Sequence, residues 1–483
     1  MTTLRNLFLA LGTVTVFSMP ICRAQVANEV VYTLMEGSTL SDDCLICGRP
    51  TIVYPLRGTF SLVPVEANPL FTRYRMTNIA FTANRGGAEQ RDISGTGLFQ
   101  IGGELAVVQD MKLDVKIGTN SLNFTNEDRT ATRLFPFIET SLVQTQFNLL
   151  QFFSMQLVAA PVREIWFSTA NGFTSAVNQQ RGEPGDVLSS SGRIVKSWSK
   201  LVARLNLSTV PEAPGIDALD MGPGGEILFS FDQNQTSTTL GAIQHGDLVS
   251  NQGRIVARNQ TLTREFGIMP AVPDVGLDAV MVKDDGEVIF SIRTDVLSER
   301  LGKILHRGDV LSSRGQILRS NAELLSHFHP SIQKDYGLDA LYVWPSGEIW
   351  FSTEEGFQDQ QYGPVLAGDL LSDQGLVLFR NLDLLSPFSP VEDLADFGLD
   401  GLFVITDVSP HGSAARFTEI LHSAGTTSVT LRWEGAGRVY QVENASAAGA
   451  PFLPLSPILP DSTYSDARPD GLRDKLFYRL RQW

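Results

Sequence analysis

Residues 337–352 read GLDALYVWPSGEIWFS, and the boxes within this stretch recur along the chain. A Gly-Leu-Asp-Ala-like box begins at Gly215, Gly276, Gly337 and Gly398, each 61 residues after the last. Between these boxes recur a Gly-Glu-Ile-x-Phe-Ser-like box, a Gly-Asp-Leu-Leu-Ser-like box and a Gly-x-Ile-Val-like run. A fixed internal period of this kind predicts a repeat architecture.

Each unit contains four strand candidates, one for each box. The Phe-Ser strand is apolar on both faces, so both faces should be covered, as in stacked sheets. Four-stranded units that cover one another predict a propeller-like domain over residues 155–407, with four repeats of about 61 residues. One extra strand, Leu399–Thr406, could close the ring by completing the first unit. Five blades or an open stack of sheets are the alternatives.

The 61-residue period is longer than known blade repeats of about 40–50 residues, which predicts long loops in every unit. One loop separates the Phe-Ser box from the Gly-Asp box. The other begins with Asn259, Asn321 or Asn381, which we expect to cap a helical turn. A Phe seven residues later should pack into the core.

The flanking regions also have the alternating pattern of strands, so the fold class is all-β. Residues 25–150 predict an N-terminal β-sandwich, with an ambiguous run at 140–156 near its boundary. Residues 415–483 predict a small C-terminal β-sandwich.

The N-terminus has the pattern of a secretory signal peptide over residues 1–24, with Arg5 before an apolar run and small residues ahead of Gln25. Its removal would leave 36 basic and 53 acidic residues, a net charge of −17. Such a charge disfavours nucleic acid as a partner. We expect a secreted, periplasmic or cell-surface protein without a membrane-inserted segment.

The expected mature chain keeps two cysteines, Cys44 and Cys47. In an exported protein this spacing favours a local disulfide over a redox pair. No spacing of His and Cys indicates a zinc site. No cofactor is predicted, although the acidic composition leaves calcium open.

Two sets of aspartates recur in every unit. Because a residue present in every copy more often maintains the unit than performs chemistry, we expect both sets to accept turn or strand-end hydrogen bonds. A calcium or ligand site repeated in each unit is the alternative. The sets are Asp217, Asp278, Asp339 and Asp400, and Asp186, Asp247, Asp309 and Asp369.

Polar residues that differ between units are the better candidates for binding, because loops on a rigid scaffold commonly carry function. Glu354 and Glu355 lie in a variable loop and could act as a carboxylate pair. His327 and His329 flank Phe328, and we interpret them as exposed neighbours of a buried Phe rather than metal ligands. No nucleophile or phosphate-binding motif is present, so no catalytic residue is assigned.

Thr430-Leu431-Arg432-Trp433, Val439-Tyr440-Gln441-Val442 and the closing Phe477-Tyr478-Arg479-Leu480 resemble strands of fibronectin type III-like modules. Together with the repeat and the signal sequence, the chain resembles secreted bacterial β-repeat proteins with such a C-terminal module. That resemblance implies no established activity and supplies no catalytic residues.

These features favour an exported, non-enzymatic binding or scaffold protein that presents repeat loops to an extracellular glycan or protein. The alternatives are a secreted glycan hydrolase or lyase with its site at the propeller mouth, and a self-associating surface or matrix component. Converging polar residues that differ between units would favour the enzyme, and a plugged apolar centre would favour binding.

Overall fold

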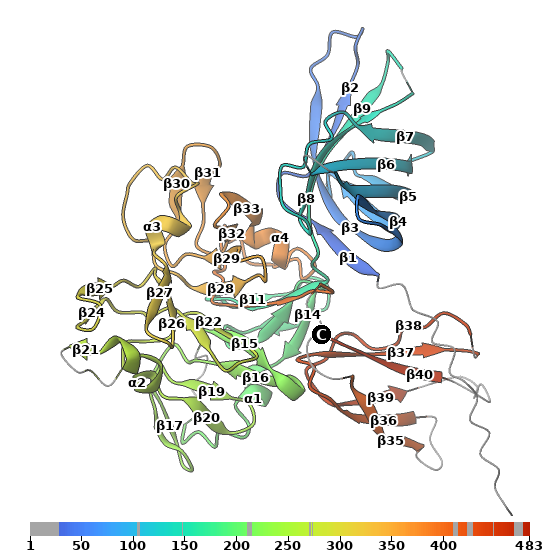
Figure 1. Ribbon diagram of the computed structural model, residues 1–483. Helices are drawn as coiled ribbons and strands as arrows, with labels where there is room; N and C mark the ends of the chain where they lie inside the picture. Colours follow the sequence, from blue (N-terminus) through green and yellow to red (C-terminus); the bar gives the residue numbers. More distant parts are fainter. Residues whose placement is uncertain are drawn as a thin grey trace, which may run out of the picture.

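A computed structural model describes residues 29–103, 107–146, 148–209, 215–269, 272, 274–408, 414–422, 428–447, 449–467 and 477–483. These residues form an N-terminal sheet, a ring of four sheets and a C-terminal module, all built from strands (Figure 1). The all-β prediction is confirmed. The expected signal sequence lies outside the described residues.

The N-terminal module is one antiparallel sheet that closes on itself. Pairing of β3 with β4 and of β1 with β9 joins its ends, and aromatic side chains such as Phe60, Phe99 and Phe124 fill its interior. Its strands are β1 (Val30–Leu34), β2 (Thr39–Asp43), β3 (Ile52–Ala67), β4 (Phe71–Ala83), β5 (Arg91–Gly102), β6 (Val108–Ile117), β7 (Asn120–Asn126), β8 (Ile138–Gln144) and β9 (Phe152–Ala160).

This closed sheet differs from the two facing sheets expected for the N-terminal region. Register shifts near Ser61 and Glu66 let the long β3 pair with β1, β2 and β4. Alternating polarity predicts one covered face, but a second sheet or closure of the first can cover it equally well. The ambiguous run at 140–156 contributes to β8 and β9, so this sheet extends to Ala160. At one end Cys44 and Cys47 form the expected disulfide, with Cα atoms 5.4 Å apart.

The repeat forms four four-stranded antiparallel sheets, which we call the four-sheet ring. In order from the inner to the outer strand, the first sheet is β34 (Gly401–Ile405), β10 (Glu164–Ser168), β13 (Val187–Ser189) and β14 (Arg193–Lys196). The second is β15 (Leu219–Gly222), β16 (Glu226–Phe229), β19 (Leu248–Ser250) and β20 (Arg254–Ala257). The third is β22 (Val280–Val282), β23 (Val288–Phe290), β26 (Val310–Ser312) and β27 (Gln316–Arg319). The fourth is β28 (Ala340–Val343), β29 (Ile349–Ser352), β32 (Leu370–Ser372) and β33 (Leu376–Phe379).

The last repeat strand closes the ring. β34 follows the fourth sheet in sequence but pairs with β10 of the first, from Glu164↔Ile405 to Ser168↔Gly401. The inner strands β34, β15, β22 and β28 contact one another in a cycle. Small residues permit this approach, because a side chain at Gly401 would collide with Leu219 of the next sheet. The equivalent residues Ala218, Ala279 and Ala340 are fully buried.

Buried polar bonds fasten neighbouring sheets together. The Ser of the Phe-Ser box donates its hydroxyl to the Leu carbonyl of the next sheet's Gly-Leu-Asp box in three places. These bonds run from Ser230 to Leu277 (2.7 Å), from Ser291 to Leu338 (3.1 Å) and from Ser352 to Leu399 (2.8 Å). The Phe residues of this box, Phe167, Phe229, Phe290 and Phe351, are each fully buried.

The long loops fold into small hairpins and short helices. The hairpins are β11 (Phe173–Thr174) with β12 (Arg181–Gly182), β17 (Gln235–Ser237) with β18 (Gly241–Ile243), β24 (Val296–Ser298) with β25 (Lys303–Leu305), and β30 (Phe357–Asp359) with β31 (Gly363–Val365). A short β21 (Ile268–Met269) pairs with β24. The helices are α1 (Trp198–Leu201), α2 (Asn259–Leu262), α3 (Asn321–Leu324) and α4 (Asn381–Leu385), and η1 (Pro223–Gly225) and η2 (Arg264–Phe266) are 3-10 turns.

The expected role of the loop asparagines was wrong. Asn259 is the first residue of α2 rather than its cap, and its buried amide bonds Gly246 O, Gly276 O and Val275 N. A carboxylate instead receives the first backbone N–H of the helix, since Asp247 Oδ1 lies 3.0 Å from Asn259 N. Phe266, Phe328 and Phe388 are buried as expected.

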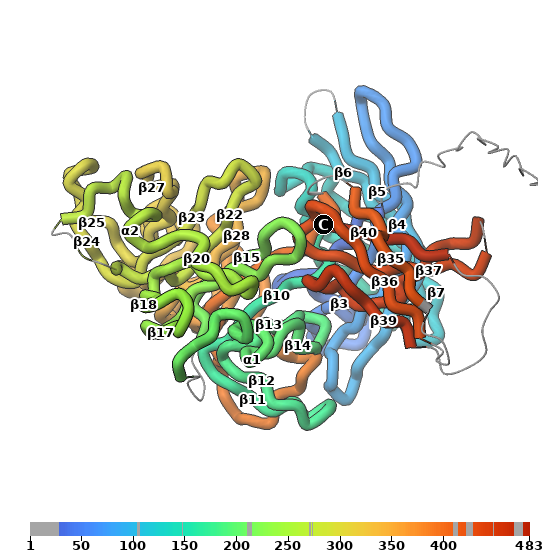
Figure 2. Tube along the Cα trace, turned by 90° about the horizontal axis from the view of Figure 1, so that it is seen from below, coloured from blue at the N-terminus to red at the C-terminus, as the bar shows by residue number. Residues whose placement is uncertain are grey.

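The C-terminal module has two three-stranded sheets that enclose Trp433 and Tyr440, whose rings lie 5.8 Å apart. One sheet is β35 (Arg416–His422), β36 (Ser428–Glu434) and β39 (Thr463–Ala467), and the other is β38 (Leu453–Pro454), β37 (Tyr440–Ala445) and β40 (Phe477–Gln482). Figures 1 and 2 show that this module and the N-terminal sheet both lie on one side of the ring.

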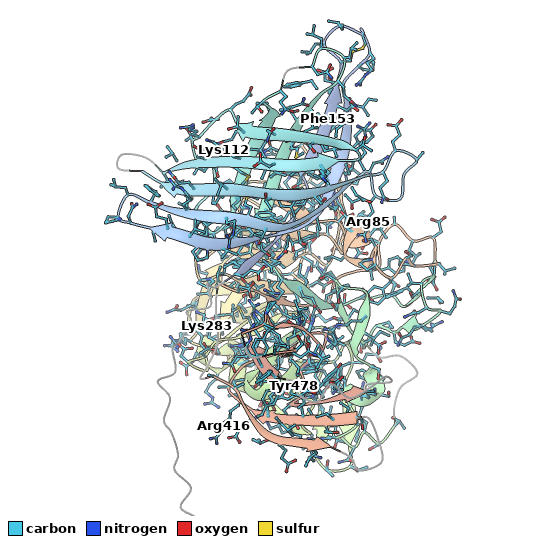
Figure 3. The ribbon with its side chains drawn as sticks, turned by 90° about the vertical axis from the view of Figure 1, so that its right-hand side faces the viewer. Arg85, Lys112, Phe153, Lys283, Arg416 and Tyr478 are labelled. Atoms are coloured by element: carbon cyan, nitrogen blue, oxygen red, sulfur yellow. A yellow bond between two sulfur atoms is a disulfide. The ribbon has the colours of Figure 1, made fainter. Side chains whose placement is uncertain are left out.

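All three modules meet at Asp407, just after β34. Its carboxylate accepts hydrogen bonds from Val31 N (2.9 Å), Arg163 (2.9 Å), Arg481 (2.8 Å) and Trp483 Nε1 (2.7 Å). Other contacts fasten the N-terminal sheet to the ring. Arg85, labelled in Figure 3, donates to Ser386 Oγ at 3.3 Å.

Candidate functional site

A cavity of about 350 Å³ opens where the inner strands of the ring begin. Each inner strand is preceded by the Asp of its Gly-Leu-Asp box, so the four sheets bring four equivalent carboxyl groups to one place. Asp217, Asp278, Asp339 and Asp400 all line the cavity. We call this the mouth cavity.

A second set of equivalent positions completes the wall. In an antiparallel sheet, the end of the second strand lies beside the start of the first. The residue two places after each Phe-Ser box therefore also faces the mouth cavity. It differs in every unit, being Ala170, Asp232, Arg293 or Glu354.

The glycine of the box makes room for this variable side chain. Gly276, Gly337 and Gly398 have φ values of 86°, 74° and 77°, which disfavour other residues. A Cβ atom at Gly276 would lie 2.3 Å from Arg293 Cβ, and one at Gly337 would collide with Glu354. The recurring Gly-Leu-Asp sequence is thus part of the cavity wall as well as of the fold.

The mouth cavity is strongly acidic. Its lining carries the carboxyl groups of Asp217, Asp232, Asp278, Asp339, Glu354 and Asp400, and one guanidinium group, that of Arg293. Arg293 Nη1 donates to Asp217 Oδ2 and to the carbonyl of Asp232, both at 3.0 Å. Arg307 donates to Glu354 at 2.6 Å.

Asp278 is the most enclosed of these groups, at 3% exposed. Among the described residues, no N–H or hydroxyl donates to either of its carboxylate oxygens. Glu354 is the neighbour able to share a proton with it. An ionised carboxylate buried without a donor is costly, so this group requires a proton or a bound cation.

Burial and mutual repulsion raise the pKa values of the cavity carboxyls. Burial raises the pKa of Asp217 to about 6, although the Arg293 charge opposes the shift. Burial and the charges of Asp217 and Glu354 raise the pKa of Asp339 to about 8. The pKa values of Asp278 and Asp400 also lie well above the ordinary range, because of burial and then neighbouring aspartates. Asp339 therefore holds a proton for much of the time at neutral pH, and the pKa values of Asp278 and Asp400 are shifted in the same direction.

The second recurring set of aspartates behaves differently. Asp186, Asp247, Asp309 and Asp369 each accept a backbone hydrogen bond from the turn before their strand. Asp247 and Asp369 also receive the first N–H of helices α2 and α4, at 3.0 Å. For Asp217, Asp278, Asp339 and Asp400, no backbone donor to the carboxylate is found among the described residues.

The structure separates the candidates named from the variable loops. Glu354 lines the mouth cavity, whereas Glu355 lies outside it in ion pairs with Arg307 and Lys334. His327 and His329 are exposed on either side of buried Phe328. The ring nitrogen of His327 lies 2.9 Å from the Asp373 carbonyl. The two histidines are not part of the cavity.

The C-terminal module contacts the opposite end of the inner strands. Arg438 of the C-terminal module is buried there, donating to Met221 O and Val282 O at 2.6 Å each and to Asp220 at 3.3 Å. The mouth cavity therefore has converging polar groups that differ between units, and the group buried at the other end is a charged arginine rather than an apolar plug.

Two negative observations concern metals and membranes. No group of three or more His, Cys, Asp or Glu side chains in the described part of the chain is arranged to hold a metal ion. Within the same residues, no helix is both long and apolar enough to cross a membrane.

The chain has little similarity to known proteins. No known protein family and no curated protein matches the chain. Two solved structures of the extracellular domain of BT4673 from B. thetaiotaomicron, described as a proposed one-component or hybrid two-component system, align at 8% identity. They cover 86% of this chain and 81% or 74% of theirs, with TM-scores of 0.21 and 0.20. At these scores the likeness carries no conclusion about fold or function.

Proposed function

We propose that the chain is an exported ligand-binding protein and that the mouth cavity is its binding site. The observation that carries this proposal is Asp278, a buried carboxyl group that faces the cavity without a donor. Buried polar groups are normally satisfied, and unsatisfied ones in a cavity are typical of sites completed by a ligand. In this account, the signal sequence directs export.

The size of the cavity favours a small ligand. A volume of about 350 Å³ lies near the lower end of the range for small-molecule sites. It suits a small molecule, or one terminal residue of a longer glycan, better than a protein surface. We further propose that the four-sheet ring is a four-bladed propeller and that the C-terminal module is fibronectin type III-like. The flanking modules then act as spacers or attachment points.

A thermal-shift screen tests this function. Wild type and Ala170→Leu would be compared with small polar compounds of positive, neutral and negative charge. Ala170 is the smallest of the four variable residues, so leucine should fill the cavity without removing a polar contact. We expect some compounds to raise the Tm of wild type but not of the variant. Equal shifts in both proteins, or none in either, would contradict a site in the mouth cavity.

A glycan-cleaving enzyme is a second candidate, because the cavity separates the pKa values of its carboxyls. Asp217, paired with Arg293, has a pKa of about 6, and Asp339 has one of about 8. One ionised and one protonated carboxyl are what glycoside hydrolysis requires. A panel of nitrophenyl glycosides separates the candidates. Turnover by wild type that Asp339→Asn abolishes would establish the enzyme, and binding without turnover would exclude it.

A further inference from the structure

The charge balance of the mouth cavity is far from neutral. Six carboxyl groups line it, and Arg293 supplies one positive charge from within, with Arg307 reaching Glu354 from outside. Arg293 is bonded to Asp217, which removes that carboxylate from the acidic surface. Asp278, Asp339 and Asp400, from three neighbouring sheets, have no ion pair among the described residues. A ligand for this surface must bring positive charge.

A bare metal ion does not fit this arrangement. Calcium requires oxygen ligands at about 2.3–2.6 Å on several sides. Among the described residues, no group of three or more acidic, His or Cys side chains is arranged to hold a metal ion. An ammonium group has three N–H donors and bonds carboxylates at about 2.7–2.9 Å, so it spans a wider cage. A cavity of about 350 Å³ also has room for the rest of an organic molecule.

A neutral sugar is a poorer fit. Glycan sites commonly offer an aromatic face for the sugar ring, but the residues that line this cavity are Asp, Glu, Arg, Ala, Pro and Gly. A neutral hydroxyl would donate to a buried carboxylate without neutralising its charge. An ammonium group donates a hydrogen bond and also neutralises the charge.

We propose that the mouth cavity binds a small primary amine, with its ammonium group held by Asp278, Asp339 and Asp400. The remainder of the amine extends past Ala170, because the first unit has no long side chain at its variable position. This assignment rests on the proposed function and specifies its ligand class. An alkyl diamine and an amino sugar share the recognised group.

The protonation state of the cavity supports the same ligand class. Burial raises the pKa of Asp339 to about 8 in the empty site, and it shifts the pKa values of Asp278 and Asp400 in the same direction, towards the protonated form. A bound ammonium would make ionisation favourable again, so protons should leave as the amine enters. The affinity for an alkylamine, which stays protonated over this range, should therefore increase as pH rises from 6 towards 8.5.

Calorimetric titration at pH 7 with matched probes tests the ligand class. The pairs are glucosamine against N-acetylglucosamine and putrescine against 1,4-butanediol, with calcium chloride as a separate probe. We expect at least one amine to bind about tenfold or more tightly than its neutral partner, as one lost charge-assisted hydrogen bond would produce. Asp278→Asn should weaken that amine by a similar factor.

The control is Asp285→Asn, since Asp285 is an exposed residue paired with Arg314 outside the cavity. It should leave amine binding unchanged. Thermal unfolding of each variant checks that it is folded, and Ala170→Leu provides a block that keeps every carboxyl. If the neutral partners bind as well as the amines and Ala170→Leu blocks them, the amine assignment fails but the cavity function survives. Tight binding of calcium alone would also overturn the assignment. If no probe binds, or Ala170→Leu blocks none of them, both proposals fail.

Discussion

Arg293 and Asp217 come from neighbouring sheets of the ring, and their ion pair (3.0 Å) sets the charge of the mouth cavity. Arg293 is half exposed, whereas Asp217 is largely buried. The guanidinium opposes the rise in the pKa values of Asp217, Asp278 and Asp339 that burial causes. Arg293 is the variable residue of the third unit. A single arginine among the four variable positions therefore sets the charge of a cavity to which all four units contribute.

Arg293→Gln should therefore make the empty protein less stable at pH 8, by about 1 kcal/mol for a half-exposed pair. It should also tighten amine binding at that pH, because it frees the carboxylate of Asp217. Urea unfolding and calorimetry would measure the two effects. Arg254→Gln is the matched control, since Arg254 pairs with Glu226 at 2.7 Å on the outer surface. A loss of amine binding in Arg293→Gln would contradict this account of the site.

Stability should depend on pH through the cavity carboxyls. The pKa of Asp339 is about 8 in the folded protein, against an ordinary value of 3.8. Between these values the folded state binds more protons than the unfolded state, so stability falls as pH rises. We expect the Tm of the empty protein to drop by several degrees between pH 5.5 and pH 8.5, at about 2–4 °C per kcal/mol.

Asp339→Asn should remove much of that decrease, because asparagine does not titrate. Thermal unfolding over the same pH range measures it. An equal decrease in wild type and variant would show that Asp339 is ionised in the empty cavity. Carboxyl groups whose pKa is lowered, such as that of Asp407, lose their protons at lower pH. They therefore do not change stability between pH 5.5 and pH 8.5.

Arg438→Met should strongly destabilise the contact between the ring and the C-terminal module. It leaves Asp220 buried without its partner, a change that costs about 3–5 kcal/mol in other proteins. Chemical unfolding measures the loss, and Asp220→Asn in the same chain should restore part of it. Arg416, labelled in Figure 3, forms an exposed pair with Glu434, and Arg416→Met should change stability by about 0.5 kcal/mol or less. Equal effects of the two substitutions would refute the role assigned to Arg438.

Asp407 should stabilise the junction of the three modules in a pH-dependent way. Burial alone would raise its pKa, but the charges of Arg163 and Arg481 and a bond from Trp483 lower it overall. Its stabilisation is present above the ordinary pKa and is lost as pH falls through the lowered value. Asp407→Asn should cost about 2–3 kcal/mol at pH 7 and less at pH 3. Asp461→Asn, which affects only an exposed pair with Lys196, should show no such dependence in urea unfolding.

The sequence predicted the repeat, because the repeat depends on local pattern, but it left ring closure open beside five blades and an open stack. Phe167 and its equivalents have the apolar neighbours of a strand that is covered on both faces. Leu399–Thr406 had no unit of its own to complete, which made ring closure one of the possibilities. Closure of the N-terminal sheet was missed, since alternation in β3 does not show which strands it pairs with. The register shifts near Ser61 that permit closure have no clear sequence signal.

For the mouth cavity, the sequence named Glu354 and kept a ligand site repeated in each unit only as the alternative for the four aspartates, and the reason is geometric. Asp278 and Asp247 both have an equivalent in every unit, and this recurrence predicted a structural role for both. Asp247 does bond turn and helix N–H groups. Asp278 lies at the start of an inner strand, where ring closure brings every copy to the same point. Differing residues at the position of Arg293 and Glu354, 61 residues apart, were the available signal.

The proton balance of amine binding tests the central claim most directly. Putrescine, whose amines stay protonated at pH 7, would be titrated at that pH in two buffers of different ionisation enthalpy, with wild type and Asp278→Asn. The account predicts that wild type releases protons as the amine binds and that the variant releases fewer. Binding without proton release, or release that Asp278→Asn leaves unchanged, would contradict a cavity of protonated carboxyls that awaits a cation.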